Sequence, residues 1–244
     1  METQQIIAIK NLHKSFGANT ILKGINLRLN KGENLVILGR SGSGKSVTIK
    51  CIVGLVQSDK GSIKISGKEI TNLKYDKLNN LRVQIGFMFQ NGALYDSMSV
   101  RQNLKFTLKH HTIDLSEEVI ESKIIEALEN VGLEESIDKM PAELSGGMQK
   151  RIALARALII KPEIILYDEP TSGLDTITSR EISELILDVQ KKFKTSSIII
   201  THDMACAKIT GNRILILKEG QIIAEGTYTE LEKSKDGWVR SFFI

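Results

Sequence analysis

Three short runs of the chain are almost continuously apolar, and they restrict the fold more than any other feature. They are "NLVIL" (34–38), "IILY" (164–167) and "SIII" (197–200). A strand with one face in water alternates apolar and polar residues, whereas a strand of a parallel sheet is covered on both faces and reads as one apolar run. The three runs therefore predict an α/β core, with a parallel sheet packed between helices.

Alternating strands are expected beside this core. The segments "INLRLN" (25–30) and "SIKIS" (62–66) place an apolar side chain at every second residue, which is the pattern of a half-buried strand. The segment "RILILKEGQIIAEG" (213–226) predicts a hairpin that turns at Glu219 and Gly220. The first two segments predict an N-terminal antiparallel β-layer.

Helical periodicity follows in the middle of the chain. In "SEEVIESKIIEALENVGL" (116–133), Ser116 is the expected N-cap and Gly132 the expected stop. The segment "SREISELILDVQKKF" (179–193) places five apolar residues on one helical stripe. We expect a single domain over residues 1–244, with a helical insertion at roughly 91–160 and a C-terminal segment at 226–244.

A glycine-rich loop follows the first apolar run. "GRSGSGKS" fits the pattern G-x-x-x-x-G-K-[ST] and opens a helical segment, which is the context that phosphate binding requires. Its glycines allow successive N–H groups to surround an anion, and the helix N-terminus adds partial positive charge. The lysine is expected on the β- and γ-phosphates and the last serine on Mg²⁺. The predicted loop consists of Gly39, Arg40, Ser41, Gly42, Ser43, Gly44, Lys45 and Ser46.

Three further polar residues end the other two apolar runs. Asp168 and Glu169 follow "IILY", at the edge of an open α/β sheet where ligands bind. Asp168 is expected to hold Mg²⁺, and Glu169 to orient or deprotonate an attacking water. His202 follows "SIII" and is placed to contact a γ-phosphate. Taken singly, paired acids at a strand end also serve solubility, and a lone histidine is usually structural.

Composition narrows the class of protein. The 244 residues carry a net charge of +4, without the clustered basic face of a nucleic-acid binder. Two distant cysteines and no CxxC spacing argue against a zinc site or a disulfide framework, and indicate a reducing compartment. No run approaches the ~20 apolar residues that span a bilayer. We expect a soluble protein, or one held at a membrane by a partner.

The order of the motifs resembles that of the ATP-binding cassette (ABC) ATPases. "LSGGM" (144–148) lies upstream of "YDEPTSGLD" (167–175), and "THD" (201–203) lies downstream. The resemblance covers nearly the whole chain. It implies a P-loop NTPase core of ABC type, with an N-terminal antiparallel β-subdomain and a helical insertion subdomain, that hydrolyses ATP with Mg²⁺.

The resemblance also implies residue roles. Phe16 occupies the place of the aromatic that stacks on adenine, where the family usually has tyrosine, and Gln90 resembles the glutamine that contacts Mg²⁺. The signature residues, expected on the γ-phosphate bound by a second copy, are Ser145, Gly146 and Gly147. Asp175 resembles the aspartate that crosses the dimer interface. One chain then cannot complete a site, and two copies enclose two ATP molecules in a two-fold dimer.

The stretch after Gln90, "NGALYDSMSV", has no place in nucleotide chemistry. In ABC transporters this surface forms part of a groove that receives a helix of the membrane permease, and Leu94, Tyr95 and Met98 suit such an interface. Alternatively they are core of the helical insertion.

Three segments resemble the ATPase of Mla/Mce-type transporters more specifically. They are "FQNGALYDSMSVRQNL", "KMPAELSGGMQKRIALARAL" and "KDGWVRSFF". That implies an ATPase at the cytoplasmic face of a bacterial inner membrane, held there by a permease, which powers phospholipid transport together with an MCE lipid-binding protein.

Other functions stay open at this point. Small-solute transporters, such as those for polar amino acids, have ATPases of similar length, and division-type ABC ATPases pair with non-transporting membrane proteins.

The chain departs from the usual family pattern at two positions. Met148 replaces the common signature glutamine, and Arg40 stands where many relatives have proline. Neither departure touches a residue assigned to chemistry. The C-terminal aromatics Trp238, Phe242 and Phe243 are compatible with core, dimer contact or a docking surface.

Overall fold

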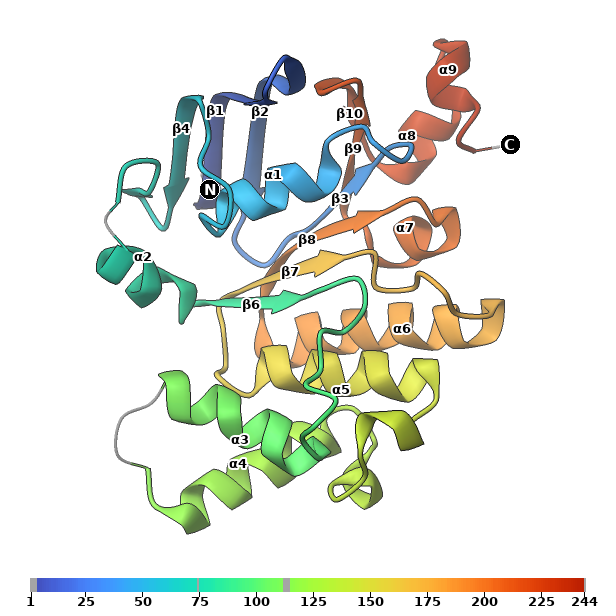
Figure 1. Ribbon diagram of the computed structural model, residues 1–244. Helices are drawn as coiled ribbons and strands as arrows, with labels where there is room; N and C mark the ends of the chain where they lie inside the picture. The colour runs from blue at the N-terminus through green and yellow to red at the C-terminus, as the bar shows by residue number, and fades with distance from the viewer. Residues whose placement is uncertain (1–3, 74, 112–114, 244) are drawn as a thin grey trace.

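Two β-sheets and a set of helices make up the computed structural model, which describes residues 4–73, 75–111 and 115–243 (Figure 1). The first sheet is four-stranded and antiparallel, in the order β2-β1-β4-β5. Its strands are β1 (Gln5–Phe16), β2 (Asn19–Asn30), β4 (Lys60–Ile65) and β5 (Lys68–Glu69). Ile25, Leu27 and Leu29 are buried while their neighbours along β2 are not, which confirms the alternating strand.

The second sheet has six strands in the order β10-β9-β3-β8-β7-β6. Its strands are β3 (Asn34–Leu38), β6 (Ile85–Met88), β7 (Ile164–Asp168), β8 (Ser196–Thr201), β9 (Arg213–Lys218) and β10 (Gln221–Gly226). The three apolar runs are β3, β7 and β8, which pair in parallel and are buried throughout, as predicted. β10 returns antiparallel to β9 through Glu219 and Gly220, both at positive φ, which confirms the hairpin.

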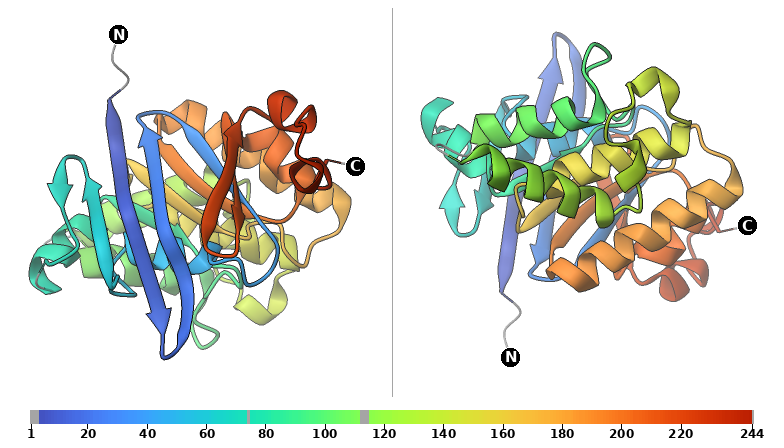
Figure 2. Two further views of the ribbon diagram at one scale, coloured as in Figure 1. Left: turned by 90° about the horizontal axis from the view of Figure 1, so that it is seen from above. Right: turned by 90° about the horizontal axis from the view of Figure 1, so that it is seen from below.

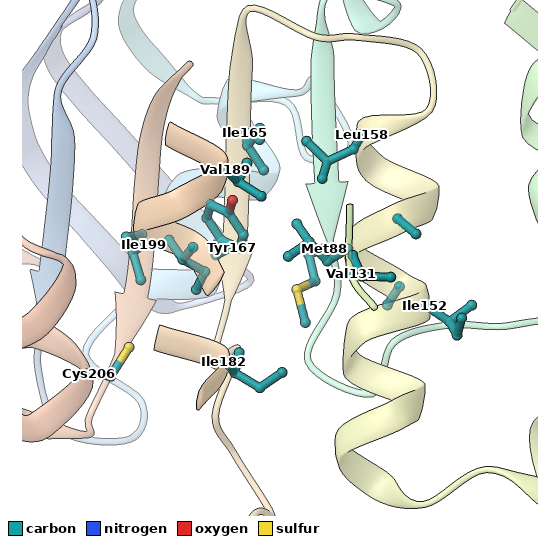
Figure 3. Close-up of a cluster of buried hydrophobic side chains, with 14 of the residues drawn as sticks. Met88, Val131, Ile152, Leu158, Ile165, Tyr167, Ile182, Val189, Ile199 and Cys206 are labelled. Atoms are coloured by element: carbon teal, nitrogen blue, oxygen red, sulfur yellow. The ribbon is translucent and has the colours of Figure 1, made fainter. Parts of the chain in front are cut away.

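The six-stranded sheet separates two hydrophobic clusters. Along β7, Ile164 and Leu166 pack into the cluster shared with α1 and the antiparallel sheet. Ile165 and Tyr167 pack into the other cluster, which contains the helices on the opposite face (Figure 3). Because successive side chains of a strand point to opposite faces, each core strand contributes to both clusters.

Helices cover both faces of this sheet. They are α1 (Lys45–Ile52), α2 (Tyr75–Arg82), α3 (Val100–His111), α4 (Glu117–Glu129), α5 (Gly146–Leu158), α6 (Thr176–Phe193), α7 (Met204–Thr210), α8 (Tyr228–Glu232) and α9 (Gly237–Arg240), with 3₁₀ turns η1 (Glu134–Ser136) and η2 (Pro141–Glu143). Seen from below in Figure 2, α3 to α6 cover one face, and the antiparallel strands lie on the far side. No helix in the described part of the chain is long and apolar enough to cross a membrane.

Serine side chains cap two of the helices, and one of them is the expected N-cap, Ser116. The Ser116 side chain accepts a hydrogen bond from the backbone N–H of Val119, and α4 begins at the next residue. The Ser145 side chain accepts one from the N–H of Met148 and opens α5. The expected helical insertion contains α3, α4 and α5.

Candidate active site

The glycine-rich loop joins β3 to α1 at the edge where the parallel strands end. Gly42 and Gly44 have φ values of 78° and 106°, in the left-handed region that favours glycine. Gly39 is required for a different reason, because a Cβ added there would lie 2.5 Å from the carbonyl oxygen of Leu217. The loop is thus closed tightly against β9, and its N–H groups lie beside the start of α1.

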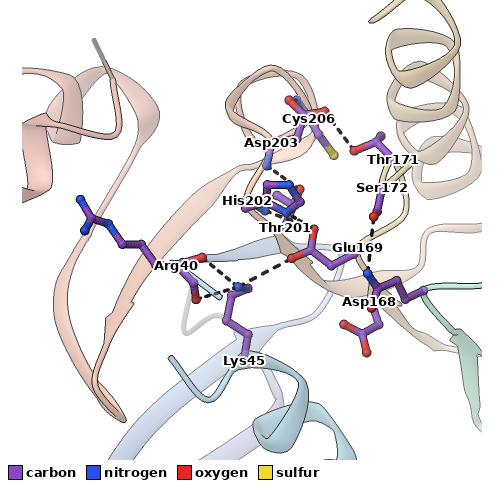
Figure 4. Close-up of polar contacts among 12 residues, drawn as sticks. Arg40, Lys45, Asp168, Glu169, Thr171, Ser172, Thr201, His202, Asp203 and Cys206 are labelled. Atoms are coloured by element: carbon purple, nitrogen blue, oxygen red, sulfur yellow. Dashed lines mark hydrogen bonds and ion pairs between the residues drawn. The ribbon is translucent and has the colours of Figure 1, made fainter. Parts of the chain in front are cut away.

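Lys45 folds back over its own loop. Its Nζ donates to the carbonyl oxygens of Gly39 at 2.8 Å and Arg40 at 3.2 Å, and lies 3.7 Å from Oε1 of Glu169. The ammonium is therefore held at the centre of the loop, facing the end of β7 (Figure 4). The Arg40 side chain points away from it.

Ser46 and Asp168 form a pair across two elements. The Ser46 hydroxyl, in the first turn of α1, donates to Oδ1 of Asp168 at 3.0 Å. Burial raises the pKa of the Asp168 carboxyl, and the hydrogen bond from Ser46 opposes that shift. A hydroxyl and a carboxylate oxygen at this separation are the hard oxygen ligands that Mg²⁺ prefers.

Glu169 and His202 form the second pair. Nδ1 of His202 lies 2.7 Å from Oε2 of Glu169, and the backbone N–H of His202 donates to the same oxygen at 3.3 Å. Glu169 itself has a φ of 51°, which is uncommon for a residue with a Cβ. Its N–H donates to the carbonyl oxygen of Ile200 at 2.9 Å, so β8 fixes the turn. The buried carboxylate thus faces both the imidazole and Lys45.

A cavity of about 630 Å³ joins these groups. Its lining includes the loop from Gly39 to Gly42 together with Gly44, Lys45, Ser46, Gln90, Glu169 and His202. Gln90 enters from the segment after β6, with its amide 3.4 Å from the Ser172 hydroxyl. The structure therefore brings most of the predicted nucleotide residues into one cavity.

Seven predicted residues lie outside the lining of that cavity. Ser43 and Asp168 are buried next to lining residues of the loop and of β7, and the other five lie elsewhere. Ser145, Gly146 and Asp175 are exposed, and Gly147 is covered by Thr178. Asp175 caps α6, and its carboxylate accepts hydrogen bonds from the N–H of Thr178 at 3.0 Å and its hydroxyl at 2.6 Å. These bonds hold the pKa of Asp175 below its usual value. Phe16 is half exposed at the end of β1, and Lys14 lies 5.2 Å from its ring centre.

The structure adds three residues that the sequence did not assign to the nucleotide site. Ile21, Val47 and Phe242 supply apolar lining to the cavity. Phe242 packs edge-on against Trp238, whose ring lies 5.8 Å from the Arg40 guanidinium. The C-terminal segment thus contacts the phosphate loop, a pairing that local sequence patterns do not contain.

The residues of this site fit a nucleoside triphosphate bound together with Mg²⁺. The Ser43 hydroxyl is buried and has no hydrogen-bond partner within the described residues. A buried polar atom without a partner calls for an explanation, and in a glycine-rich loop at a helix N-terminus a bound phosphate supplies one. Lys45 already lies within the loop, where a cation stabilises phosphate charge. The Ser46–Asp168 pair would hold the metal ion.

The fold and this site define an α/β protein that binds a nucleoside triphosphate on a glycine-rich phosphate loop. The chain belongs to the ABC transporter family: the family model described as "ABC transporter" matches residues 22–172. As a member of this family, it binds ATP with Mg²⁺ and hydrolyses ATP.

Relatives agree along most of the chain. A probable ribonucleotide transport ATP-binding protein, mkl, of Mycobacterium leprae is 39% identical, covering 97% of this chain and 68% of that protein. The chloroplastic protein trigalactosyldiacylglycerol 3 of Arabidopsis thaliana is 38% identical, over 99% of this chain and 74% of that one. A methionine import ATP-binding protein, MetN, of Rhizobium etli is 38% identical, over 91% and 61%.

Solved structures share the fold. The ATP-binding cassette MJ0796, described as a dimer in a post-hydrolysis state bound to ADP and Pi, has a TM-score of 0.83 and 34% identity, covering 91% of this chain and 98% of that one. The cbiO1 protein of Clostridium perfringens, part of an ABC transporter complex, has a TM-score of 0.86 and 31% identity, covering 95% and 92%.

Proposed function

We propose that this chain is the ATP-hydrolysing subunit of a bacterial ABC transporter that moves lipid, with phospholipid as the substrate class. The observation that carries the hydrolytic part is the buried Glu169 carboxylate between Lys45 and His202. Lipid as the cargo is supported by the Mla/Mce-type sequence around Gln90 and in "MPAELSGGM". One relative, from Arabidopsis thaliana, bears the name of a galactolipid.

In this proposal Glu169 is the general base. It takes the proton of a water molecule as the water oxygen bonds to the γ-phosphorus and the bond to the bridging oxygen breaks, which releases ADP and phosphate. His202 orients the carboxylate from 2.7 Å and faces the γ-phosphate. Lys45 stabilises the phosphate charge, and Asp168, Ser46 and Gln90 hold Mg²⁺. Phe16 stacks on adenine.

A second copy completes each site in this proposal. The exposed N-terminus of α5, capped by Ser145, is suited to a phosphate bound by the partner. Gly146 and Asp175 are exposed, and Gly147 follows Gly146 in the first turn of α5. In this proposal the three residues reach the site of the second copy together with Ser145. Glu169→Gln, which blocks hydrolysis, should produce a tight dimer with ATP. A Glu169→Gln protein that stays monomeric by light scattering with saturating ATP would remove this part.

The permease helix binds a groove on the face of α2, α3 and β6. This groove has a volume of about 820 Å³, and we call it the docking groove. Tyr95 packs edge-on against Phe106 at a centroid distance of 4.9 Å, and Phe106 lies 4.2 Å from His110. Leu55, which also lines the groove, is 54% exposed. Exposed apolar and aromatic side chains in a concave surface are typical of a helix-binding site.

Only one of the three predicted contact residues is in the lining of the docking groove. Of the three predicted contacts, Tyr95 lines the docking groove, whereas Leu94 packs against the larger hydrophobic cluster and Met98 is half-buried. Leu55→Glu and Tyr95→Glu should reduce recovery of the permease and leave ATP hydrolysis by the isolated chain unchanged. Ile223→Glu, at an exposed apolar position on β10, is the matched control. Equal collapse of hydrolysis would assign Leu55 and Tyr95 to the core instead.

Purification from native membranes in mild detergent tests the cargo. Recovery of a multi-span permease and an MCE protein with bound phospholipid, identified by mass spectrometry, is the expected result. It would also assign the cytoplasmic face of the inner membrane, with attachment through the permease. Recovery of a different membrane partner without lipid would retain the ATPase and exclude the lipid proposal.

The second candidate is the ATPase of a small-solute transporter. It is favoured by a relative named for methionine import, at 38% identity. A periplasmic solute-binding protein in the same purification would support it.

A further inference from the structure

A buried lysine in the signature helix has no role in the reaction described above. Lys150 lies on α5, three residues after Gly147, and its exposed fraction is 7%. Burying an ammonium costs free energy unless hydrogen bonds compensate. Burial lowers the pKa of Lys150, while the charges of Glu169 and Asp168 act in the opposite direction.

The ammonium contacts the backbone of two catalytic segments. Its Nζ donates to the carbonyl oxygen of Gln90 and, at 3.3 Å, to that of Glu169. Gln90 follows β6 and Glu169 follows β7, so one side chain joins the ends of two core strands to α5. Hydrogen bonds from a charged donor are stronger than neutral ones, and such a link resists independent movement of the segments.

A second basic residue of α5, Arg156, also binds the segment that follows β6, but it does not reach Glu169. Arg156 donates to the carbonyl oxygens of Ala93 at 2.6 Å and Gly92 at 2.8 Å, just after Gln90. The segment after β6 is therefore held to α5 at both ends. Lys150 differs because it also reaches the carbonyl of the catalytic glutamate.

We propose that Lys150 is a positioning residue that couples the two ATP sites of the dimer. Gln90 and Glu169 face the ATP of their own chain, whereas the N-terminus of α5 faces the ATP of the second copy. Because α5 is a rigid helix, a shift of either carbonyl moves the signature residues. The inference rests on the ATP-sandwich dimer of the proposed function.

Steady-state hydrolysis against MgATP concentration tests the coupling. Lys150→Met keeps the length of the side chain and removes its donors. We expect turnover to fall at least ~10-fold, equivalent to one hydrogen bond from a charged donor. The Hill coefficient should fall to about 1, the value for independent sites. MgATP affinity, followed by Trp238 fluorescence, should stay within ~3-fold, since Lys150 does not line the cavity.

The neighbouring residue supplies the control. Arg151→Met removes a charge from the same helix, where Arg151 donates to the Val131 carbonyl and pairs with Glu181 at 3.0 Å. It should keep the Hill coefficient of the unmodified chain. Lys150→Gln, which keeps one amide donor, should give intermediate turnover, and it carries the test if Lys150→Met does not fold.

Two outcomes overturn the coupling role. One is a Hill coefficient for both Lys150 variants equal to that of Arg151→Met. The other is a loss of MgATP affinity in proportion to turnover, which would show a purely structural role. Light scattering of Glu169→Gln with ATP is measured in parallel. A monomer there refutes the dimer itself, whereas a dimer with unaltered cooperativity in the Lys150 variants refutes only the coupling.

Discussion

Gly147 and Thr178 provide a sharp test of how the signature helix packs on α6. A Cβ added at Gly147 would lie 2.6 Å from Cγ2 of Thr178. Ordinary carbon–carbon contacts are about 3.5–4.0 Å, so Gly147→Ala requires a shift of roughly 1 Å. Thr178 cannot simply rotate, because its hydroxyl donates to the Asp175 carboxylate at 2.6 Å.

The expected magnitude follows from two opposing terms. Overpacking of this kind costs about 1–3 kcal/mol, and the gain in helix propensity from Gly to Ala offsets up to ~1 kcal/mol. Thr178→Ser removes the methyl group and keeps the hydroxyl. In the Thr178→Ser background, Gly147→Ala should therefore cost about 1–3 kcal/mol less than it does in the unmodified chain.

A double-mutant cycle measures this difference. The free energy of unfolding of the four proteins is obtained from urea denaturation followed by Trp238 fluorescence. Contacting residues give coupling energies above ~0.5 kcal/mol, whereas independent sites add within that value. A coupling below ~0.5 kcal/mol would refute the packing of Gly147 against Thr178 and, with it, the position of the α5 N-terminus.

Three further predictions concern other parts of the molecule. Burial raises the pKa of the Asp168 carboxyl above its ordinary value of 3.8. The ionised carboxylate therefore destabilises the folded chain at any pH above 3.8, where the unfolded chain is already ionised. Asp168→Asn should therefore raise the Tm of the nucleotide-free chain at neutral pH, by an amount that becomes smaller as the pH falls towards 3.8. The same substitution should abolish ATP hydrolysis. An unchanged or lower Tm at neutral pH, measured by calorimetry, would contradict this prediction. A Cβ at Gly220 would meet the carbonyl oxygen of the β2 backbone, whereas one at Gly17 meets nothing within 4 Å, although both glycines have positive φ. Gly220→Ala should thus destabilise the chain by at least ~1 kcal/mol more than Gly17→Ala in urea denaturation, and equal costs would refute the close approach. Burial raises the pKa of Cys51 and of Cys206 to about 11, so both thiols should react slowly with a disulfide reagent at pH 8 until urea unfolds the chain; rapid labelling of the native protein would argue against their burial.

The core strands could be predicted because burial on both faces leaves a direct mark on the sequence. β3, β7 and β8 each read as one apolar run, and each is buried throughout. The first residue of α6 could not be predicted from the apolar pattern. The apolar stripe predicted a helix over 179–193, whereas α6 begins at Thr176. Asp175 caps an exposed first turn in which Ile177 is 74% exposed, so apolar periodicity is absent there.

The site was predictable where residues act within one motif. The phosphate loop, Asp168, Glu169 and His202 lie close together, because each lies at or just after the end of a parallel strand at the same edge of the sheet. Lys150 escaped prediction, since a lysine on a helix reads as solvent-exposed unless the tertiary neighbours are known. Phe242 depends on a contact with a loop some two hundred residues earlier, which no local pattern encodes.

The division of the core by the six-stranded sheet has a consequence for engineering. Substitutions on opposite sides, such as Ile49→Val in the cluster with α1 and Ile152→Val in the cluster with α5, share no packed neighbours. Their effects on the free energy of unfolding should add, because separated sites without shared partners behave independently. Stabilising changes can therefore be selected in two separate libraries, one for each face of the sheet, and combined without a search of every pairing.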